Sequence, residues 1–364
     1  MADSGGKTIA YVGSYSDESA RGIHAFEFDV ATGRLERLGG AGGVTNPSFL
    51  ALHPGGRFLY AVNETGQFAG EGSGAVAAFS IDPASGGLTL LNRQATGGPG
   101  PCHLTVDATG RCVLAANYRG GSVCVVPIEA DGRLGERTDF VQHQGSSVHP
   151  TRQTGPHAHS VTLDPTNTFA CVADLGVDRV VIYRLDPENG RLSPNADPWY
   201  QARRGAGPRH FAFGRNGWFA YLINELDSTV TVLRCDRTRG GLEQVQTISA
   251  LPGDFEGEST AADIHVHPSG RFVYGSNRGH DSIAVFAVNR ETGRLRLVGH
   301  ESTRGETPRG FALDPTGEWL VAANQNSDNI VVFRIDTETG RLTPTGHEVE
   351  VSSPTCVKFL SLNP

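Results

Sequence analysis

Arginine, histidine and glutamate residues gather in short polar segments that recur along the chain, each next to an apolar run. Guanidinium groups bind carboxylates and phosphates through paired hydrogen bonds, whereas imidazole and carboxylate groups can transfer protons. Together these residue types predict a site that binds an anionic small molecule and carries out acid–base chemistry on it. The candidates for anion binding are Arg119, Arg209, Arg278 and Arg309, and those for proton transfer are His157, His159 and Glu225.

The elements that must position these residues are repeated. A polar residue that ends an apolar run recurs every ~47–57 residues, a period typical of a four-stranded propeller blade. Each unit has an alternating strand, a Pro-x-Gly-Arg turn such as 268–271, an apolar strand, a β-branched strand and a Thr-Gly-Arg-Leu turn such as 339–342. The continuous apolarity of the second strand is typical of a strand buried on both faces. The recurring polar residues are Asn63, Asn117, Asp174, Asn224, Asn277 and Asn324.

The two ends of the chain each hold part of one further unit. Residues 354–364 repeat only the opening strand, and residues 8–45 repeat everything except that strand. A unit divided in this way closes a ring, so the chain is predicted to be an all-β, seven-bladed β-propeller in which the C-terminal strand completes the N-terminal blade. We expect residues 1–364 to form one domain, with Phe359 and Leu360 in the innermost strand of the closing blade.

The topology of a blade predicts where the candidate residues meet. Because successive strands alternate in direction, the segments that enter the first strand and those that join the second to the third lie at one end of the central channel. The hairpins at the other end are uniform, which indicates a structural role. The segments at this end vary, and varied loops on a rigid scaffold are the usual place for a site. We expect a solvated bowl there, whose side chains contribute little to folding.

Several polar residues also have structural interpretations. The recurring Asn, and the Asp that follows it in most units, are interpreted as turn residues that bond the backbone. Glu225 departs from the pattern of most blades, and only Glu64 matches it, so both structural pairing and function stay open for it. His265 and His267 have the spacing of a metal-binding pair, but His53 occupies the same place as His267 in another blade. We therefore expect no metal and no other cofactor.

Bulk properties argue against several classes of partner and location. The formal net charge of −8 argues against nucleic-acid binding, and no apolar run approaches the length of a membrane span. Residues 1–7 lack the apolar core of a signal peptide, so a cytoplasmic protein, monomeric or weakly self-associating, is expected. The six cysteines form no Cys-x-x-Cys pair and are expected to be free, mostly buried thiols.

The chain also resembles a known family, the seven-bladed propeller lactonases, which include propeller-type 6-phosphogluconolactonases and 3-carboxy-cis,cis-muconate lactonizing enzymes. The resemblance rests on six strings in a fixed order, at 11–15, 155–159, 174–179, 207–210, 224–226 and 276–283. It implies an active site of one histidine, two arginines and one glutamate, which fall on His159 (or His157), Arg209, Arg278 and Glu225. Further substrate contacts are expected from His103, Arg119, His157, His210, His280 and Arg309.

The resemblance implies metal-independent hydrolysis of a sugar-acid lactone, with 6-phospho-D-glucono-1,5-lactone as the first candidate substrate. Glu225 or His159 would be the general base, while Arg209 and Arg278 would hold the phosphate and polarise the carbonyl. Two alternatives stay open. One is lactonization of a muconate-type dicarboxylate by the same residues, and the other is a non-catalytic propeller that binds a ligand or a partner.

Overall fold

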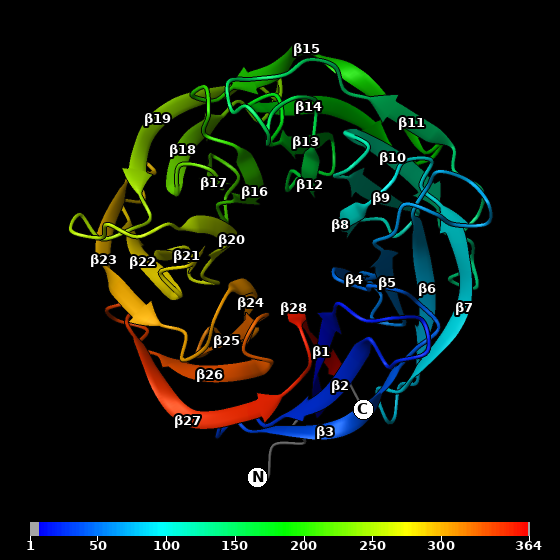
Figure 1. The fold of residues 1–364 in the computed structure, drawn as a ribbon, viewed down its shortest axis with the longest axis horizontal. Coiled ribbons are helices and arrows are strands. Elements are labelled where there is room, and N and C mark those ends of the chain that lie inside the picture. Colours follow the sequence, from blue (N-terminus) through cyan, green and yellow to red (C-terminus); the bar gives the residue numbers. More distant parts are fainter. Residues whose placement is uncertain (1–6, 363–364) are drawn as a thin grey trace.

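The computed structural model describes residues 7–362 and arranges them as seven β-sheets in a ring about a central axis (Figure 1). Each sheet is an antiparallel meander of four strands, and the described residues contain no helix. The prediction of an all-β, seven-bladed β-propeller is therefore confirmed.

Six blades are continuous in sequence, and each runs from its innermost strand outwards (Figure 1). They are β4–β7 (Leu50–Leu52, Phe58–Asn63, Ala75–Ile81, Leu88–Ala95), β8–β11 (Pro101–Val106, Cys112–Asn117, Ser122–Pro127, Asp139–Gln142), β12–β15 (Ala158–Leu163, Phe169–Asp174, Arg179–Asp186, Arg191–Gln201), β16–β19 (Pro208–Phe213, Phe219–Asn224, Thr229–Cys235, Leu242–Ser249), β20–β23 (Thr260–Val266, Phe272–Arg278, Ser282–Val288, Leu295–Ser302) and β24–β27 (Pro308–Leu313, Trp319–Asn324, Asn329–Ile335, Leu342–Glu350).

The seventh blade joins the two ends of the chain. Its innermost strand β28 (Pro354–Leu362) pairs with β1 (Lys7–Ser14), which continues into β2 (Ile23–Phe28) and β3 (Leu35–Ala41), so red and blue strands lie side by side in Figure 1. Phe359 lies opposite Ala10, and Leu360 opposite Ile9. The C-terminal strand thus completes the N-terminal blade, as predicted.

Tyrosines of the second strands join neighbouring blades. The Tyr60 hydroxyl donates to the carbonyl of Gly132 in the next blade at 3.1 Å, and the Tyr274 hydroxyl donates to that of Gly340 at 2.9 Å. Gly340 has a φ of 74°, and a Cβ there would lie 2.5 Å from the Phe272 ring. The Thr-Gly-Arg-Leu turn therefore needs glycine both for its backbone conformation and for this close approach.

Two histidines in front of the Pro-x-Gly-Arg turns have one structural role. His53 Nε2 lies 3.1 Å from the carbonyl oxygen of Gly110, and His267 Nε2 lies 2.7 Å from that of Gly317, in each case in the next blade. His265 Nε2 instead lies 3.0 Å from a carboxylate oxygen. His265 and His267 thus bind separate protein partners and do not converge on one point.

The recurring Asn and the Asp that follows it hold the loops between strands. Asn277 Nδ2 donates to the Ala250 carbonyl at 2.8 Å, and Asn324 Nδ2 donates to the Thr303 carbonyl at 3.1 Å. Asp281 has a φ of 50° and accepts a backbone N–H of the next blade at 2.8 Å. The structural interpretation of these residues is confirmed.

The core lies between the faces of adjacent blades. The second strands are almost wholly buried, as in β9 and β25, where every residue is buried. Apolar clusters fill the space between blades, for example the cluster that contains Tyr274, Leu320 and Phe333. The six cysteines are buried and free. This packing fixes the innermost strands, which carry most of the site.

Candidate active site

A β-bulge brings one side chain from each of several innermost strands to the centre of the ring. In β8, β12, β16 and β24 the pairing register shifts across one residue near the start of the strand. A bulge takes that residue out of the regular alternation and re-aims its side chain. The residues at this position are Cys102, His159, Arg209 and Arg309. Three candidate site residues thus share one structural device.

The loops that leave the second strands supply a second tier of side chains. Directly after the recurring Asn come Glu64, Tyr118 and Glu225 in these loops and Arg278 at the end of β21. The two tiers touch one another: Arg209 Nε lies 3.0 Å from Glu225 Oε2, and the Tyr118 ring lies 5.2 Å from that of His159. Both tiers therefore meet at one end of the ring, as the alternation of strand direction requires.

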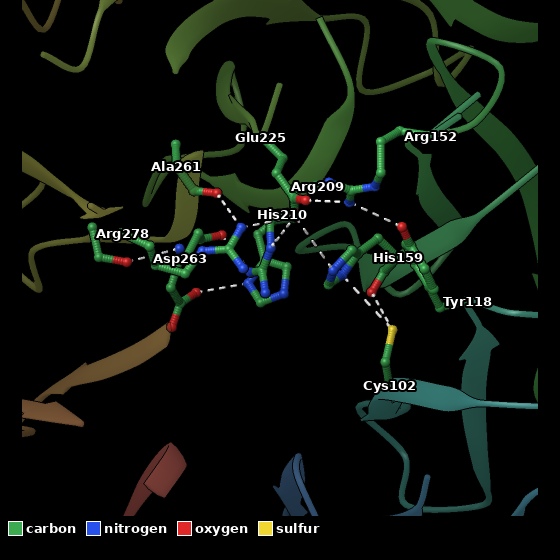
Figure 2. Close-up of polar contacts among 12 residues, drawn as sticks. Cys102, Tyr118, Arg152, His159, Arg209, His210, Glu225, Ala261, Asp263 and Arg278 are labelled. Atoms are coloured by element: carbon green, nitrogen blue, oxygen red, sulfur yellow. Dashed lines mark hydrogen bonds and ion pairs between the residues drawn. The ribbon is translucent and has the colours of Figure 1, made fainter. Parts of the chain in front are cut away.

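Glu225 is the centre of an ion cluster that includes three arginines (Figure 2). Its Oε2 lies 3.0 Å from Arg209 Nε and 3.0 Å from Arg278 Nη2, and its Oε1 lies 2.5 Å from Arg152 Nη2. Arg152 also donates to the Tyr118 hydroxyl at 3.1 Å. Glu225 and Arg209 are only 3 % and 2 % exposed. The carboxylate thus holds guanidinium groups from three different segments in fixed positions.

The cluster carries excess positive charge. Burial alone would raise the pKa of the Glu225 carboxyl, but its arginine partners, foremost Arg278, outweigh burial and lower that pKa to about 2. Burial, with Arg278 and Arg309 nearby, lowers the pKa of Arg209 to about 10. At neutral pH three charged guanidinium groups therefore surround one ionised carboxylate. Such an excess in a site shielded from water favours the binding of an anion.

His159, rather than His157, faces this cluster. Its Nε2 lies 3.9 Å from Glu225 Oε2. His157 stacks on Tyr118 with ring centroids 4.7 Å apart, and its Nδ1 lies 2.9 Å from the Tyr118 carbonyl oxygen. Burial, followed by the charge of Arg209, keeps the pKa of His159 well below its ordinary value. His159 is therefore a neutral ring at pH 7.

A second acidic residue and the remaining arginine lie in another part of the mouth. The Tyr15 hydroxyl donates to Glu64 Oε2 at 3.1 Å, and the Arg309 guanidinium lies 5.4 Å from the Tyr15 ring centroid. Burial raises the pKa of Tyr15 to about 12. Within residues 7–362 the Arg309 guanidinium has neither a hydrogen bond nor an ion pair within 4.0 Å. Its donors are therefore available to a ligand.

Three aromatic rings from different blades meet near the axis. The ring centroids of Phe49 and His103 are 4.1 Å apart, those of His103 and His210 are 5.2 Å apart, and those of Phe49 and His210 are 5.8 Å apart. A whole blade, that of β12, separates His103 from His210 along the ring. We call Phe49, His103 and His210 the axial ring cluster. His210 Nδ1 lies 2.7 Å from Asp263 Oδ1.

The structure does not bring two of the predicted residues to this cluster. Arg119 is exposed and packs beside Gly100. The His280 ring packs against Phe255 with centroids 4.8 Å apart, and its Nδ1 lies 2.6 Å from Ser282 Oγ. The other predicted residues, apart from His157 on its edge, lie in the clusters described above.

The sequence interpretation missed Arg152, Tyr118 and Asp263 as site residues. Arg152 lies in the segment of 15 residues between β11 and β12, at positions 143–157, which has no counterpart in the repeat. An insertion of this length, at the end of the blade that bears the site, could have indicated that this segment contributes a site residue. Asp263 and His210 both lie in the innermost strands of their blades, but nothing in the sequence predicts that they contact each other.

The expectation of a solvated bowl is wrong. Arg209, Glu225 and His159 are all buried; Arg209 and Glu225 pair with each other, and His159 packs beside them. The physical reason is that the bulges turn long side chains inwards over the narrow axis, where opposite charges satisfy one another. The cluster is therefore part of the folded interior as well as a candidate site.

The axial mouth of this β-propeller holds buried arginines around an ionised glutamate, with neutral histidines beside them. These features define a class of propeller suited to a small anionic ligand. The family model described as "Lactonase, 7-bladed beta-propeller" matches residues 9–359. The chain belongs to this family. The resemblance inferred from its sequence strings is thereby confirmed.

Relatives with curated names cover nearly the whole chain. A protein of Bacillus subtilis named 6-phosphogluconolactonase is 41 % identical over 354 residues, which are 97 % of this chain and 99 % of that protein. A protein of Formosa agariphila with the same name is 35 % identical over 308 residues, 84 % of this chain and 86 % of the relative. The chain is thus similar over its length to proteins named as lactone hydrolases.

Solved structures agree with this relationship. The periplasmic gluconolactonase of Pseudomonas aeruginosa superposes with a TM-score of 0.92 at 36 % identity, over 98 % of this chain and 100 % of that one. A protein of Lactobacillus plantarum superposes with a TM-score of 0.89 at 34 % identity, over 97 % and 99 %. Among the described residues, no helix is long and apolar enough to cross a membrane.

Proposed function

We propose that the protein hydrolyses 6-phospho-D-glucono-1,5-lactone to 6-phosphogluconate. The observation that carries the proposal is the set of three arginines on one buried carboxylate at the axial mouth, together with Arg309, which has no partner among the described residues. The substrate carries a phosphate, and its lactone carbonyl becomes an oxyanion during hydrolysis. Both features need fixed positive charge in a site shielded from water. The names of the closely similar relatives support the same reaction.

The arginines differ in how much of their hydrogen-bonding capacity the protein uses. Arg209 Nε bonds Glu225, and its Nη1 donates to the Ala262 carbonyl at 2.5 Å. Arg278 bonds the Ala261 carbonyl and Glu225 through Nη2, but its Nε is buried with no protein partner. A buried donor without a partner is costly, so a ligand oxygen at Arg278 would recover that cost. We assign Arg209 and Arg278 to the lactone carbonyl and its oxyanion, and Arg309 to the phosphate.

Glu225 is better suited to hold the arginines than to accept a proton. Two of its acceptor sites on Oε2 and one on Oε1 already face guanidinium groups, and its pKa of about 2 makes it a weak base. His159 has no carboxylate partner at hydrogen-bond distance, and its Nε2 faces the cluster from 3.9 Å. We assign to His159 a hydrogen bond to the substrate within the site.

The test is a panel of δ-lactones with and without the 6-phosphate. Acid release is followed with a pH indicator, and spontaneous hydrolysis is subtracted from each rate. We expect kcat/KM to be highest for the phosphorylated lactone and to fall by roughly 10²-fold or more in Arg278→Ala, because an electrostatic contact to the reacting group is lost. Arg111→Ala, which changes an exposed arginine paired with Glu188, is the matched control. A wild-type rate no higher than the spontaneous rate for every lactone would refute the proposal.

A further inference from the structure

We propose that His210, oriented by Asp263, is the general base that takes the proton from the attacking water. The inference rests on the proposed lactone hydrolysis and identifies its base, which the residue pattern had left between Glu225 and His159. A carboxylate that fixes one imidazole nitrogen as a donor leaves the other nitrogen as an acceptor, which is the arrangement a histidine base requires.

Asp263 is anchored from several directions. Its Oδ1 lies 2.7 Å from His210 Nδ1 and accepts the backbone N–H of Ile264 at 2.9 Å. Its Oδ2 lies 3.0 Å from His265 Nε2 and accepts the N–H of Phe311, in the next blade, at 3.3 Å. Although burial opposes ionisation, His265 and His210 keep the pKa of Asp263 well below its ordinary value. The acceptor for His210 is therefore a carboxylate that cannot rotate freely.

The tautomer of His210 follows from this contact. An ionised carboxylate only accepts hydrogen bonds, so the neutral His210 ring carries its proton on Nδ1. Its Nε2 has no hydrogen-bond partner among residues 7–362. This atom is also absent from the set of unpartnered atoms that are fully buried, so it keeps some exposure to solvent. The lone pair of Nε2 therefore remains open to solvent at the centre of the ring.

The position of His210 places this lone pair beside the charged cluster. His210 directly follows Arg209 in β16, and the bulge at Arg209 lets both side chains approach the axis. The His210 ring lies 5.4 Å from that of His159 and 5.2 Å from that of His103 (Figure 2 shows His210 between Asp263 and His159). A lactone whose carbonyl contacts Arg209 would have its reacting carbon near this ring.

Other histidines at the mouth lack this arrangement. His103 Nδ1 accepts the N–H of Val161 at 3.3 Å, so the neutral ring carries its proton on Nε2 and has no free acceptor nitrogen. His159 Nδ1 has only the Cys102 sulfur, at 3.7 Å, as a side-chain neighbour of hydrogen-bonding type. His157 is bonded to a backbone carbonyl and lies on the edge of the site. Among His103, His157, His159 and His210, only His210 has a buried carboxylate on one nitrogen and, within residues 7–362, no partner on the other. His265 shares Asp263 through its Nε2, but its ring packs on Phe311 rather than among the axial rings.

The charges around His210 determine its pH dependence. Burial and Arg209 lower its pKa to about 4, whereas Asp263 opposes the decrease. The other titratable groups around it are His265, His103, His159 and Lys358, whose Nζ lies 4.6 Å from the Phe49 ring centroid. The base is active when neutral, so kcat should fall as the pH decreases through the pKa of the complex. A bound anion raises that pKa above the value of the free protein.

The reaction balances without a cofactor. Water adds to the lactone carbonyl carbon, a C–O bond forms, and one proton of the water moves to His210 Nε2 while Arg209 and Arg278 stabilise the oxyanion. The oxyanion then reforms the carbonyl, and the bond from this carbon to the ring oxygen breaks. The departing alkoxide takes the proton back from His210. The product is the open-chain hydroxy acid, and the protein returns to its starting state.

The first test measures kcat and KM for lactones with and without the phosphate in three variants. In His210→Gln and Asp263→Asn we expect kcat to fall by roughly 10²–10⁴-fold for both lactones, with KM changed less than about threefold. His267→Gln removes a buried histidine that directly follows β20 and should keep wild-type kcat. Thermal melts of all three variants separate a loss of folding from a loss of chemistry.

The second test needs no variant and no turnover. In ¹⁵N-histidine-labelled wild-type protein, two-bond ¹H–¹⁵N spectra should show His210 with its proton on Nδ1 near pH 7. A proton on Nε2, or kcat of His210→Gln within threefold of wild type, would overturn the inference and leave the proposed function intact. A wild-type protein that hydrolyses neither lactone would overturn both proposals.

Discussion

Arg209 and Glu225 form an ion pair with 3.0 Å between Nε and Oε2, and both side chains are buried. The pair joins the bulge of β16 to the loop after β17 in the same blade. It therefore links the two strands of one hairpin at the axial mouth. The candidate site residues are thus also held in place by a buried ion cluster.

Glu225→Gln should destabilise the fold as well as reduce activity. The substitution keeps the shape of the side chain but leaves Arg209, Arg278 and Arg152 without a counter-charge. Breaking one partner of a buried ion pair typically costs about 3–5 kcal/mol of unfolding free energy. Chemical denaturation of wild type, Glu225→Gln and the exposed control Glu188→Gln measures this loss. A Glu225→Gln protein as stable as the control would contradict it.

The same difference should depend on pH with a defined sign. The pKa of Glu225 is about 2 in the folded protein, below its value of 4.5 when unperturbed. The stabilisation is therefore fully present above about pH 4.5, and it is lost as the pH falls toward about 2. The gap in unfolding free energy between wild type and Glu225→Gln should be constant from pH 7 to 5 and narrow below that. A gap that widens on acidification would be inconsistent with the ion cluster.

Arg309→Gln should separate phosphate recognition from folding. Its guanidinium has no hydrogen bond or ion pair within residues 7–362, so the melting temperature should change little, in contrast to Arg209→Ala. A lost phosphate contact should raise KM for the phosphorylated lactone by roughly tenfold and leave the unphosphorylated lactone nearly unaffected. Steady-state kinetics on both lactones decides this. Equal effects on the two lactones would remove Arg309 from the phosphate site.

Deletion of residues 357–364 should open the ring. The deletion removes most of β28. Residues 7–12 of β1 then lose their pairing partners and form an unpaired edge. Unpaired edges favour aggregation. Size-exclusion chromatography and thermal melts, with Ser361→Ala as the control at an exposed position of the same strand, measure the outcome. A monomeric truncation with the wild-type melting temperature would contradict the role of β28 in closure.

Thiol reactivity should change sharply on unfolding. All six cysteines are buried and free, and burial raises the pKa of Cys235 to about 12 and that of Cys124 to about 12 as well. A buried thiol with a raised pKa reacts slowly. We expect a disulfide-exchange reagent to label almost no thiols in native protein and six in denaturant. Four or fewer in denaturant would indicate disulfides.

A chelator should leave the activity unchanged. Within residues 7–362, histidine, cysteine and acidic side chains form no group of three with the geometry of a metal site. The imidazoles of the weak candidate pair, His265 and His267, are bonded to Asp263 and to the Gly317 carbonyl. Activity is measured before and after treatment with EDTA and after addition of Mg²⁺, Ca²⁺ or Zn²⁺. Loss with EDTA and recovery with one ion would show a metal-dependent reaction.

The sequence alone determined the architecture, because each blade of a propeller is specified by one local sequence repeat. Each blade needs an apolar second strand, a glycine at a turn such as Gly340, and a polar cap such as Asn277, and each of these is visible within one unit. The division of one unit between residues 8–45 and 354–364 fixed both the number of blades and the closure. The end of the ring that bears the site followed from strand direction alone.

Only the tertiary structure decided which of the polar residues meet and how. Arg152 reaches Glu225 from an insertion 73 residues away, and Asp263 reaches His210 from 53 residues away in the next blade. Such contacts depend on the radius of the ring and on the direction in which each bulge points its side chain. The repeat pattern in the sequence specifies neither of these. The prediction of a solvated site failed for the same reason. The sequence places the charged residues at the mouth of the channel, but the structure packs them against one another near the axis, away from water.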